Sequence, residues 1–348
     1  MSDPLQNVRR VCVIRMGGMG DILLATPGVR ALYHRLMELH GVAEIDFVVA
    51  KGMAPAVEGI SYVRRVIEFD KHPDGDGRIK KLVPFLRGIR QQNYDLVLNF
   101  QPALKTFSIT WASGARRVIT FKKDRSKQAD GHVRHAIDDY NKELVALGIQ
   151  SVPDWRMDFT VPPDAHARVA SVLAQAGIGA NEPVLVVNPA GTRPINRWPS
   201  HRFAAFLNRM AEEMPRVRLV LTGGPRDQEI ADEILRETTA NVLNVANKLS
   251  VKELGALLAR ANVVLTGDTG PLHIASALGR PIVCLSGAAD PDRTGPTSPL
   301  DLVVINRELS CVPCGDRVCK RGDIACMNQL PVEWVMRAVR QRLSGTVK

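Results

Sequence analysis

Short apolar runs alternate with helical patterns along almost the whole chain, and this alternation restricts the fold more than any other feature. The runs have the length of strands, and turn residues separate them from the helical segments. The predicted strands are 11–14, 45–49, 63–69, 95–99, 117–121, 184–188, 217–222, 242–243, 263–266, 282–285 and 302–305. Repeated strand–helix units of this kind predict an α/β fold with doubly wound parallel sheets.

The predicted helices lie between these strands. They are 22–39, 79–91, 132–147, 164–176, 200–213, 227–238, 251–260, 271–278 and 331–343. The pattern restarts after Pro-rich, weakly periodic sequence at 152–163. Because 348 residues exceed the usual size of a single core, two domains are expected. We predict two Rossmann-like doubly wound domains facing one cleft, at 1–162 and 163–330, and then a C-terminal helix within 331–348.

Composition and charge limit the function classes. Hydrophobic residues make up 45% of the chain and charged residues 24%, as in ordinary globular proteins. No apolar run approaches the roughly 18 residues of a membrane span, and 11–14 resembles a strand rather than a signal peptide, so the expected location is the cytoplasm. The net charge of +10 indicates an anionic partner: a phosphorylated substrate, an anionic membrane surface or nucleic acid. Nucleic acid ranks last, because few aromatic residues accompany the basic segment 116–127.

The strongest functional signal lies in 261–287, where a strand, a Gly-rich turn, a helix and a second strand follow one another. Ligands of parallel α/β sheets bind at the carboxyl ends of strands, and a helix start favours an anion such as a diphosphate. The segment therefore predicts a nucleotide or sugar-nucleotide site. Its candidate residues are Asp268, Thr269, Gly270, Pro271 and His273. Ordinary turn residues and a core histidine are the structural alternatives.

A second Gly-rich turn, Gly17-Gly18-Met19-Gly20-Asp21, follows the first strand. It does not match the dinucleotide fingerprint G-x-G-x-x-G. Asp21 stands at a predicted helix start, and Thr26-Pro27 marks a second start or a kink. Asp21 either caps the helix or acts as a general base on a hydroxyl nucleophile.

Two further turns belong to the second half of the chain. In 188–199, Arg193 and Arg197 precede a helix, a placement that suits phosphate contact, with a solvated basic loop as the alternative. Gly223 and Gly224 follow the next strand and are candidates for backbone contact with a ribose or base.

Four cysteines fall within sixteen residues: Cys311, Cys314, Cys319 and Cys326. Clustered thiols in a chain without an export signal indicate metal rather than disulfides, and four thiolates can hold zinc tetrahedrally. The spacing is not that of a standard zinc ribbon, so an iron–sulfur cluster and reduced thiols stay open. A structural metal is predicted more strongly than a catalytic one, because four thiolates leave no open coordination position.

Together these turns resemble those of the ADP-heptose–lipopolysaccharide heptosyltransferases, a family of inverting glycosyltransferases. The resemblance covers nearly the whole chain and rests on four motifs and the cysteine cluster. The motifs are Met19-Gly20-Asp21 with Thr26-Pro27, Arg197-Trp198-Pro199, Gly267-Asp268-Thr269-Gly270-Pro271-Leu272-His273, and Asp290-Pro291-x-Arg293-Thr294-Gly295-Pro296. It implies a GT-B fold and transfer of a heptose from ADP-heptose to the inner core of lipopolysaccharide, with inversion and without a metal or other cofactor in catalysis.

The resemblance also implies roles for individual residues. Asp21 matches the base, and Thr192, Asp268, Thr269, Gly270 and His273 match the nucleotide and diphosphate site. Apart from the resemblance, the acceptor is expected to bind at the first turn and the basic segment, at Gly18, Met19, Gly20, Arg116, Lys122, Lys123 and Arg125. The donor-binding candidates are Thr192, Arg193, Asn196, Arg197, Gly223, Gly224 and the 268–273 turn. Asn196 stands where family members often carry Lys, so Arg193 or Arg197 supplies the charge or the donor differs. The basic segment predicts a peripheral protein on the cytoplasmic face of the inner membrane.

Several alternatives remain at this point. Asp290-Pro291-Asp292 and Asp74-Gly75-Asp76 have the D-x-D pattern of metal-dependent glycosyltransferases, but that pattern belongs to a single-sheet architecture, and both are interpreted as loops. A related glycosyltransferase with another sugar nucleotide or acceptor is one rival function. A sugar-nucleotide epimerase of similar fold and a non-catalytic nucleotide-binding scaffold are the others.

Overall fold

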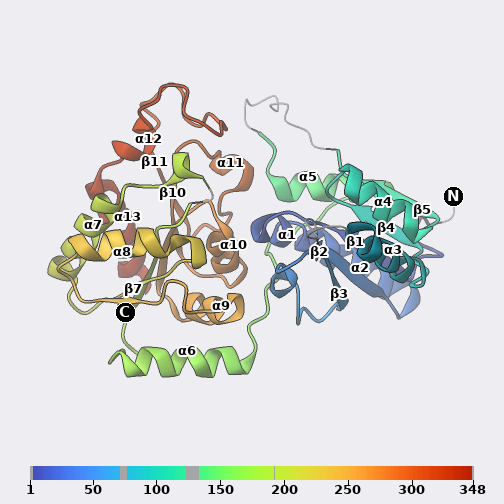
Figure 1. The fold of residues 1–348 in the computed structure, drawn as a ribbon, viewed down its shortest axis with the longest axis horizontal. Coiled ribbons are helices and arrows are strands. Elements are labelled where there is room, and N and C mark those ends of the chain that lie inside the picture. Colours follow the sequence, from blue (N-terminus) through green and yellow to red (C-terminus); the bar gives the residue numbers. More distant parts are fainter. Residues whose placement is uncertain (1–2, 71–76, 123–132, 192, 347–348) are drawn as a thin grey trace. The chain divides into compact units, whose positions relative to one another are not determined.

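The computed structural model describes residues 3–70, 77–122, 133–191 and 193–346. The chain divides into two compact units, Met1–Thr160 (unit 1) and Val161–Lys348 (unit 2). Each unit contains one parallel sheet with helices on its faces (Figure 1). Within the described residues, no helix is both long and apolar enough to cross a membrane.

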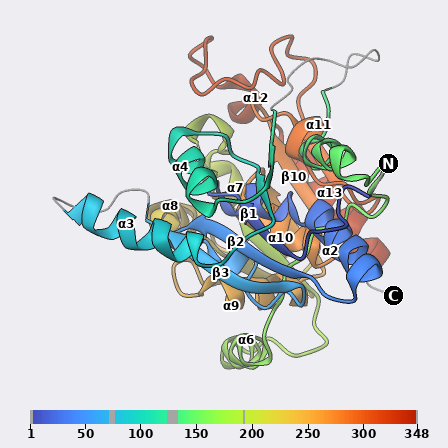
Figure 2. The same cartoon turned by 90° about the vertical axis from the view of Figure 1, so that its right-hand side faces the viewer.

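Unit 1 has a five-stranded sheet in the order β3-β2-β1-β4-β5. Its strands are β1 (Arg10–Ile14), β2 (Glu44–Ala50), β3 (Val63–Phe69), β4 (Leu96–Asn99) and β5 (Arg117–Thr120). Its helices are α1 (Met19–Leu23), α2 (Thr26–His40), α3 (Gly77–Arg90), α4 (Leu104–Ser113) and α5 (Ala136–Lys142), with 3₁₀ turns at Ala54–Ala56 and Glu143–Leu147. The helix α2 lies on one side of the sheet and α3 and α4 lie on the other (Figure 2).

Unit 2 has a six-stranded sheet in the order β11-β10-β9-β6-β7-β8. Its strands are β6 (Val184–Asn188), β7 (Arg218–Leu221), β8 (Val242–Asn244), β9 (Val263–Gly267), β10 (Ile282–Ser286) and β11 (Leu302–Ile305). Its helices are α6 (Pro163–Gln175), α7 (Ser200–Glu213), α8 (Gln228–Glu237), α9 (Val251–Arg260), α10 (Gly270–Ala277), α11 (Pro291–Thr294), α12 (Ala325–Asn328) and α13 (Val332–Thr346), with 3₁₀ turns at Pro194–Asn196 and Pro225–Asp227.

The central strands are buried on both faces, which explains why they are continuous apolar runs rather than alternating ones. In unit 1, every residue from Val11 to Ile14 is inaccessible to solvent. In unit 2, the same holds for Val184 to Val187 and for Val263 to Leu265. The predicted α/β class, with two doubly wound parallel sheets, is confirmed.

Two of the predicted helices were wrong in more than their end residues, and α4, α11 and α12 were not predicted. The segment 22–39 is broken into α1 and α2, because Pro27 fits only the first turn of a helix. The segment 132–147 is helical only from Ala136 and ends in the 3₁₀ turn. The segment 290–292, interpreted as a loop, begins α11, with Asp290 as its cap.

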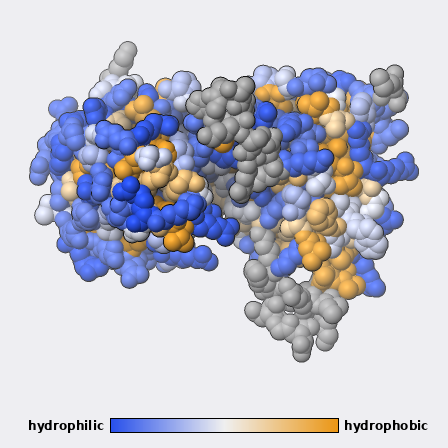
Figure 3. All heavy atoms as spheres, turned by 90° about the horizontal axis from the view of Figure 1, so that it is seen from above, coloured by the Kyte–Doolittle hydropathy of each residue, from blue (hydrophilic) through white to orange (hydrophobic). Residues whose placement is uncertain are grey.

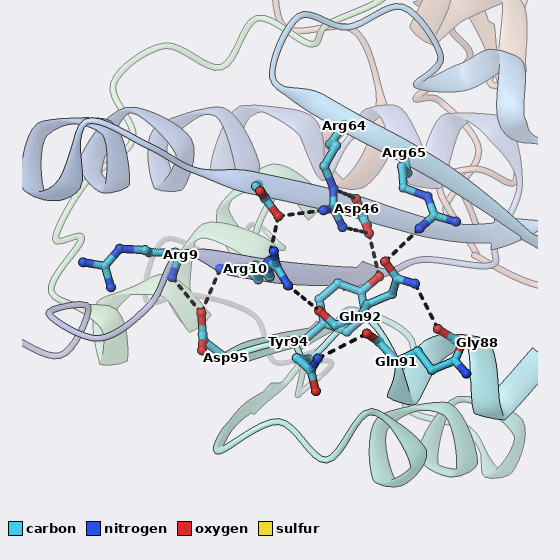
Figure 4. A network of polar contacts seen from close by, with 12 residues as sticks. Arg9, Arg10, Asp46, Arg64, Arg65, Gly88, Gln91, Gln92, Tyr94 and Asp95 are labelled. Carbon is cyan, nitrogen blue, oxygen red and sulfur yellow. Dashed lines mark hydrogen bonds and ion pairs between the residues drawn. The ribbon is translucent and has the colours of Figure 1, made fainter.

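At the amino edge of the unit 1 sheet, a network of ion pairs and hydrogen bonds joins neighbouring strands (Figure 4). The carboxylate of Asp46, with no exposed surface, accepts from Arg64 Nε at 2.9 Å, from Arg64 Nη2 at 2.6 Å and from the Tyr94 hydroxyl at 2.7 Å. Burial raises the pKa of the Tyr94 hydroxyl. The ion pairs of Arg10 with Glu44 and of Arg64 with Glu44 and Asp46 join β1, β2 and β3 at this edge.

Candidate functional site

The strand order of unit 1 reverses between β1 and β4, so the carboxyl ends of these two strands are the expected ligand-binding position. Arg15 follows β1, and Gln101 follows β4. The Arg15 Nη1 atom donates to Gln101 Oε1 at 2.8 Å and so joins the two loops. The guanidinium of Arg15 also lies over the Tyr140 ring, 5.7 Å from its centroid.

Asp21 contacts both Arg15 and the helix start. Its Oδ1 lies 2.7 Å from Arg15 Nη2, and its Oδ2 accepts from the Gly18 N–H at 3.1 Å. Nearly half of the Asp21 side chain is exposed, whereas that of Arg15 is mostly buried. The capping role considered from the sequence is therefore present, together with an ion pair that the sequence did not predict.

Gly17 lies close to this ion pair. A Cβ atom at position 17 would lie 2.5 Å from Asp21 Oδ2 and 2.9 Å from Arg15 Nη1. Both distances are below van der Waals contact, so any side chain at position 17 would displace the Asp21 carboxylate. The glycine permits the close approach of the carboxylate to the turn.

The strand order of unit 2 reverses between β6 and β9. Asn188 ends β6, and its Nδ2 atom donates to Thr266 Oγ1 at 3.0 Å and to Thr269 Oγ1 at 3.2 Å. Asn188 and Thr266 are buried. This amide connects the two strand ends of the expected site. Asn188 was not among the predicted site residues, although its position at the end of the first strand of the unit marked it.

Asp268 connects the turn after β9 with the start of α10 and with α11. Its Oδ1 lies 3.5 Å from His273 Nε2, and its Oδ2 accepts from the Thr294 hydroxyl at 2.7 Å. Gly270 and Pro271 form the first turn of α10. The structure thus brings the predicted residues Asp268, Thr269, Gly270, Pro271 and His273 together, and it adds Thr294.

Three buried polar atoms in this part of unit 2 have no hydrogen-bond partner among the described residues. They are Asn188 Oδ1, Asn196 Oδ1 and His273 Nδ1. Unpaired buried polar atoms are rare because each costs stability, and a ligand or water commonly satisfies them. Their concentration around β6, β9 and α10 indicates a binding position for a polar ligand.

The predicted turn at 188–199 is largely described. Arg197 Nε donates to the Gly191 carbonyl oxygen at 3.0 Å, and its side chain packs on Gly191. Trp198 is buried, and its Nε1 donates to the Leu330 carbonyl oxygen at 3.0 Å, which makes it a core residue. Arg193 is half-buried at the start of the 3₁₀ turn. Thr192 lies outside the described residues.

The Gly223-Gly224 turn after β7 holds a second capping carboxylate. Gly224 N–H donates to Asp227 Oδ2 at 2.8 Å, and the Gly223 carbonyl oxygen accepts from the Asn247 N–H at 2.9 Å. The first bond is internal to the turn, and the second joins the turn to the segment after β8.

The predicted acceptor-binding residues fall into two groups. Gly18, Met19 and Gly20 form the start of α1 beside Asp21. Arg116 and Lys122 are exposed at the two ends of β5, and the Lys122 N–H donates to Glu143 at 3.0 Å. Lys123 and Arg125 lie outside the described residues, as does Asp74-Gly75-Asp76.

The four clustered cysteines carry free thiols. Within the described part of the chain, which includes all four, no group of three or more His, Cys, Asp or Glu side chains is arranged to hold a metal ion. Burial and then the neighbouring thiols raise the pKa of Cys326, whereas backbone N–H groups, first that of Ile324, lower the pKa of Cys319. A structural metal at this cluster stays a prediction.

The chain is similar to known proteins of one family. The model of glycosyltransferase family 9 (heptosyltransferase) matches residues 83–325. The lipopolysaccharide core heptosyltransferase OpsX of Haemophilus influenzae is 23% identical over 310 residues, which are 85% of this chain and 84% of that protein.

Two solved structures have similar folds. A glycosyl transferase family 9 protein of Veillonella parvula has a TM-score of 0.83 at 22% identity, with 99% of each chain covered. The E. coli ADP-heptose lipopolysaccharide heptosyltransferase II has a TM-score of 0.74 at 18% identity, with 97% of this chain and 99% of that chain covered. At these identities the likeness concerns the fold.

Proposed function

Since the chain belongs to glycosyltransferase family 9, the heptosyltransferase family, we propose that it transfers a heptose from ADP-heptose to a hydroxyl of the lipopolysaccharide inner core, with inversion. The observation that carries the donor side is the group of unpaired buried atoms, Asn188 Oδ1 and His273 Nδ1, at the strand ends of unit 2. The names of the related enzymes support the choice of heptose and acceptor.

The donor diphosphate is assigned to the start of α10. The backbone N–H group of Gly270 belongs to the first turn of this helix, where an anion is stabilised. Arg193 and Arg197 supply positive charge in the place where family members often carry Lys and this chain has Asn196. Charge develops on the leaving ADP in the transition state, and fixed donors that face it give the largest electrostatic contribution to catalysis. We propose that no metal takes part in this step.

Asp21 is assigned the role of general base. It accepts the proton of the acceptor hydroxyl while that oxygen forms a bond to the anomeric carbon and the bond from this carbon to the diphosphate oxygen breaks. Its two contacts, to Gly18 N–H and Arg15, hold the carboxylate in one orientation, and its partial exposure leaves it accessible to an acceptor. General base catalysis of this kind contributes about 10²–10⁴-fold to a rate.

The acceptor is amphiphilic, and we propose that it is met at an anionic membrane surface on the cytoplasmic side. The exposed Arg116 and Lys122 support this assignment, together with the net charge of +10. Each basic residue near such a surface contributes about 1 kcal/mol.

Mass spectrometry of the product tests the proposal. The protein is incubated with ADP-heptose and with truncated core acceptors that end in different sugars, and the expected result is one added heptose on one of them. Free heptose or an altered sugar nucleotide in the absence of acceptor would instead identify an epimerase. Tight ADP binding without turnover on any acceptor would identify a nucleotide-binding scaffold.

A further inference from the structure

Three large apolar side chains of the helix α4 are exposed, whereas the polar Thr106, Thr110 and Ser113 are buried together with Ile109. Leu104 is 88% exposed, Phe107 49% and Trp111 85%. Their spacing of three and four residues places them on one side of the helix, and we call them the α4 apolar face. A surface helix of a globular protein normally has the opposite arrangement.

Hydrogen bonds hold α4 in this orientation. The buried Asn99, at the end of β4, donates through Nδ2 to Thr106 Oγ1 at 3.3 Å and to Thr110 Oγ1 at 3.2 Å. Rotating the helix to bury Trp111 would break these bonds and leave the Asn99 amide unpaired in the core, which is costly. The exposure of the α4 apolar face is therefore built into unit 1.

Positive charge flanks the α4 apolar face. Residues 101–122 contain four Lys or Arg and no Asp or Glu. Arg116 follows the end of the helix, and Lys122 follows β5 at the sheet edge from which α4 begins. Both are exposed. In the space-filling view, patches of apolar surface lie among hydrophilic regions (Figure 3).

We propose that the α4 apolar face is a docking surface for an anionic lipid bilayer. Leu104, Phe107 and Trp111 enter the boundary between headgroups and acyl chains, and the flanking Lys and Arg residues meet anionic headgroups. Large apolar and aromatic side chains beside basic ones are typical of helices that lie in a membrane interface. The inference rests on the proposed function, in which the acceptor is met at a membrane surface. The helix α4 begins at the same edge of the unit 1 sheet as Asp21.

The area argues against a second copy of the chain as the occupant. Three side chains of this size offer on the order of 400 Å², whereas a standard protein interface buries about 800 Å² on each partner. The positive charge around the helix would also repel the same charge on a second copy, whereas it attracts anionic lipid.

Flotation of the full-length protein with lipid vesicles tests the proposal. Wild-type protein is expected to float with an equal mixture of phosphatidylcholine and phosphatidylglycerol and weakly with phosphatidylcholine alone. The triple variant Leu104→Ser, Phe107→Ser, Trp111→Ser should partition about tenfold or more weakly into the anionic vesicles. The matched control Val318→Ser, at a 78% exposed apolar residue of unit 2, should bind like wild type.

Two further measurements make the result unambiguous. Trp fluorescence should shift to shorter wavelength when wild-type protein binds anionic vesicles. The variant Trp111→Phe should still float with the vesicles but should lose this shift. The single variant therefore tests the α4 apolar face even if the triple variant does not fold. Transfer to a delipidated, water-soluble acceptor should be unchanged in the triple variant. Equal flotation of the triple variant and wild type would overturn the proposal. It would also be overturned if the wild-type protein were a dimer in solution and the triple variant were a monomer. If neither wild type nor any variant transfers heptose, the proposed function is refuted, whereas the flotation result still decides the membrane proposal.

Discussion

The pattern Gly-Gly-x-x-Asp occurs once in each unit, at 17–21 and at 223–227, and the two copies build nearly the same turn. Each follows a parallel strand, and each Asp accepts from the N–H of the second glycine, at 3.1 Å in unit 1 and 2.8 Å in unit 2. They differ in surroundings. Asp21 follows β1, where the strand order reverses, and pairs with Arg15, whereas β7 lies away from the reversal in its sheet.

The comparison of the two turns distinguishes the helix-capping role of Asp21 from its proposed role as a base. A carboxylate at the third position of a helix is a common way to satisfy a free N–H group, and Asp227 shows that the turn alone needs no other role for its Asp. What distinguishes Asp21 is its position at the topological switch point and its contact with Arg15, which is tied to the loop after β4. The predicted base function therefore depends on the surroundings and not on the motif.

The largest expected effect is that of Asp21→Asn. If Asp21 is the base, turnover should fall about 10²–10⁴-fold, because the amide cannot accept the proton, while ADP affinity measured by calorimetry is unchanged. Asp227→Asn is the matched control, since it weakens the same type of cap, and its turnover should stay within about threefold of wild type. Equal losses in the two variants would show that both carboxylates only cap.

The next effect concerns the first glycine of each turn. Gly17→Ala places a Cβ atom 2.5 Å from Asp21 Oδ2, and Gly223→Ala places one 2.9 Å from the Asp227 Cβ. Both should lower the free energy of unfolding by about 1–3 kcal/mol, measured in urea. Only Gly17→Ala should also reduce kcat by about 100-fold, because it moves the base. Similar kcat values for the two variants would contradict the assignment of Asp21.

The free energy of unfolding of unit 2 should itself depend on pH, and Asp301 is the reason. Burial raises the pKa of Asp301 to about 6, although it accepts from the Ser298 and Ile282 N–H groups. The folded state then holds a proton between about pH 4 and 6 that the unfolded state releases, so the stability that Asp301 contributes is lost as pH rises through this window. Relative to Asp301→Asn, wild type should lose on the order of 2 kcal/mol from pH 4 to 7 in urea unfolding. Parallel curves for the two proteins would refute this.

The smallest effect should come from the contact that only Asp21 has. Arg15→Gln removes the ion pair, frees the orientation of the carboxylate and should lower kcat about tenfold with little change in the KM for the donor. Arg15→Lys keeps the charge and should recover part of the loss. An unchanged kcat in Arg15→Gln would mean that the Gly18 N–H alone positions Asp21.

Much of the fold could be predicted because its signals are local. The strands 63–69, 184–188 and 302–305 and the helices 200–213 and 251–260 have the predicted bounds, since each is a buried run or an amphipathic period closed by a turn residue or a cap. The helix α4 was missed for a physical reason. Its inward side chains are Ile109 and the polar Thr106, Thr110 and Ser113, whose hydroxyls are satisfied by Asn99 or by nearby backbone. The side of α4 that faces the core therefore lacks the usual apolar pattern.

The candidate site was predicted in part for a related reason. The 268–273 turn lies within one strand–helix unit, so the sequence alone determined it. The same holds for the two Gly-Gly-x-x-Asp turns and for the parallel strands. Only the tertiary structure decided that Arg15 meets Gln101, 86 residues away, that Asn188 meets Thr266 and Thr269, and that the face of α4 with Leu104 and Trp111 points to solvent. The physical reason is that turns and periods depend on neighbouring residues, whereas strand order and the pairing of buried polar groups depend on contacts between distant parts of the chain.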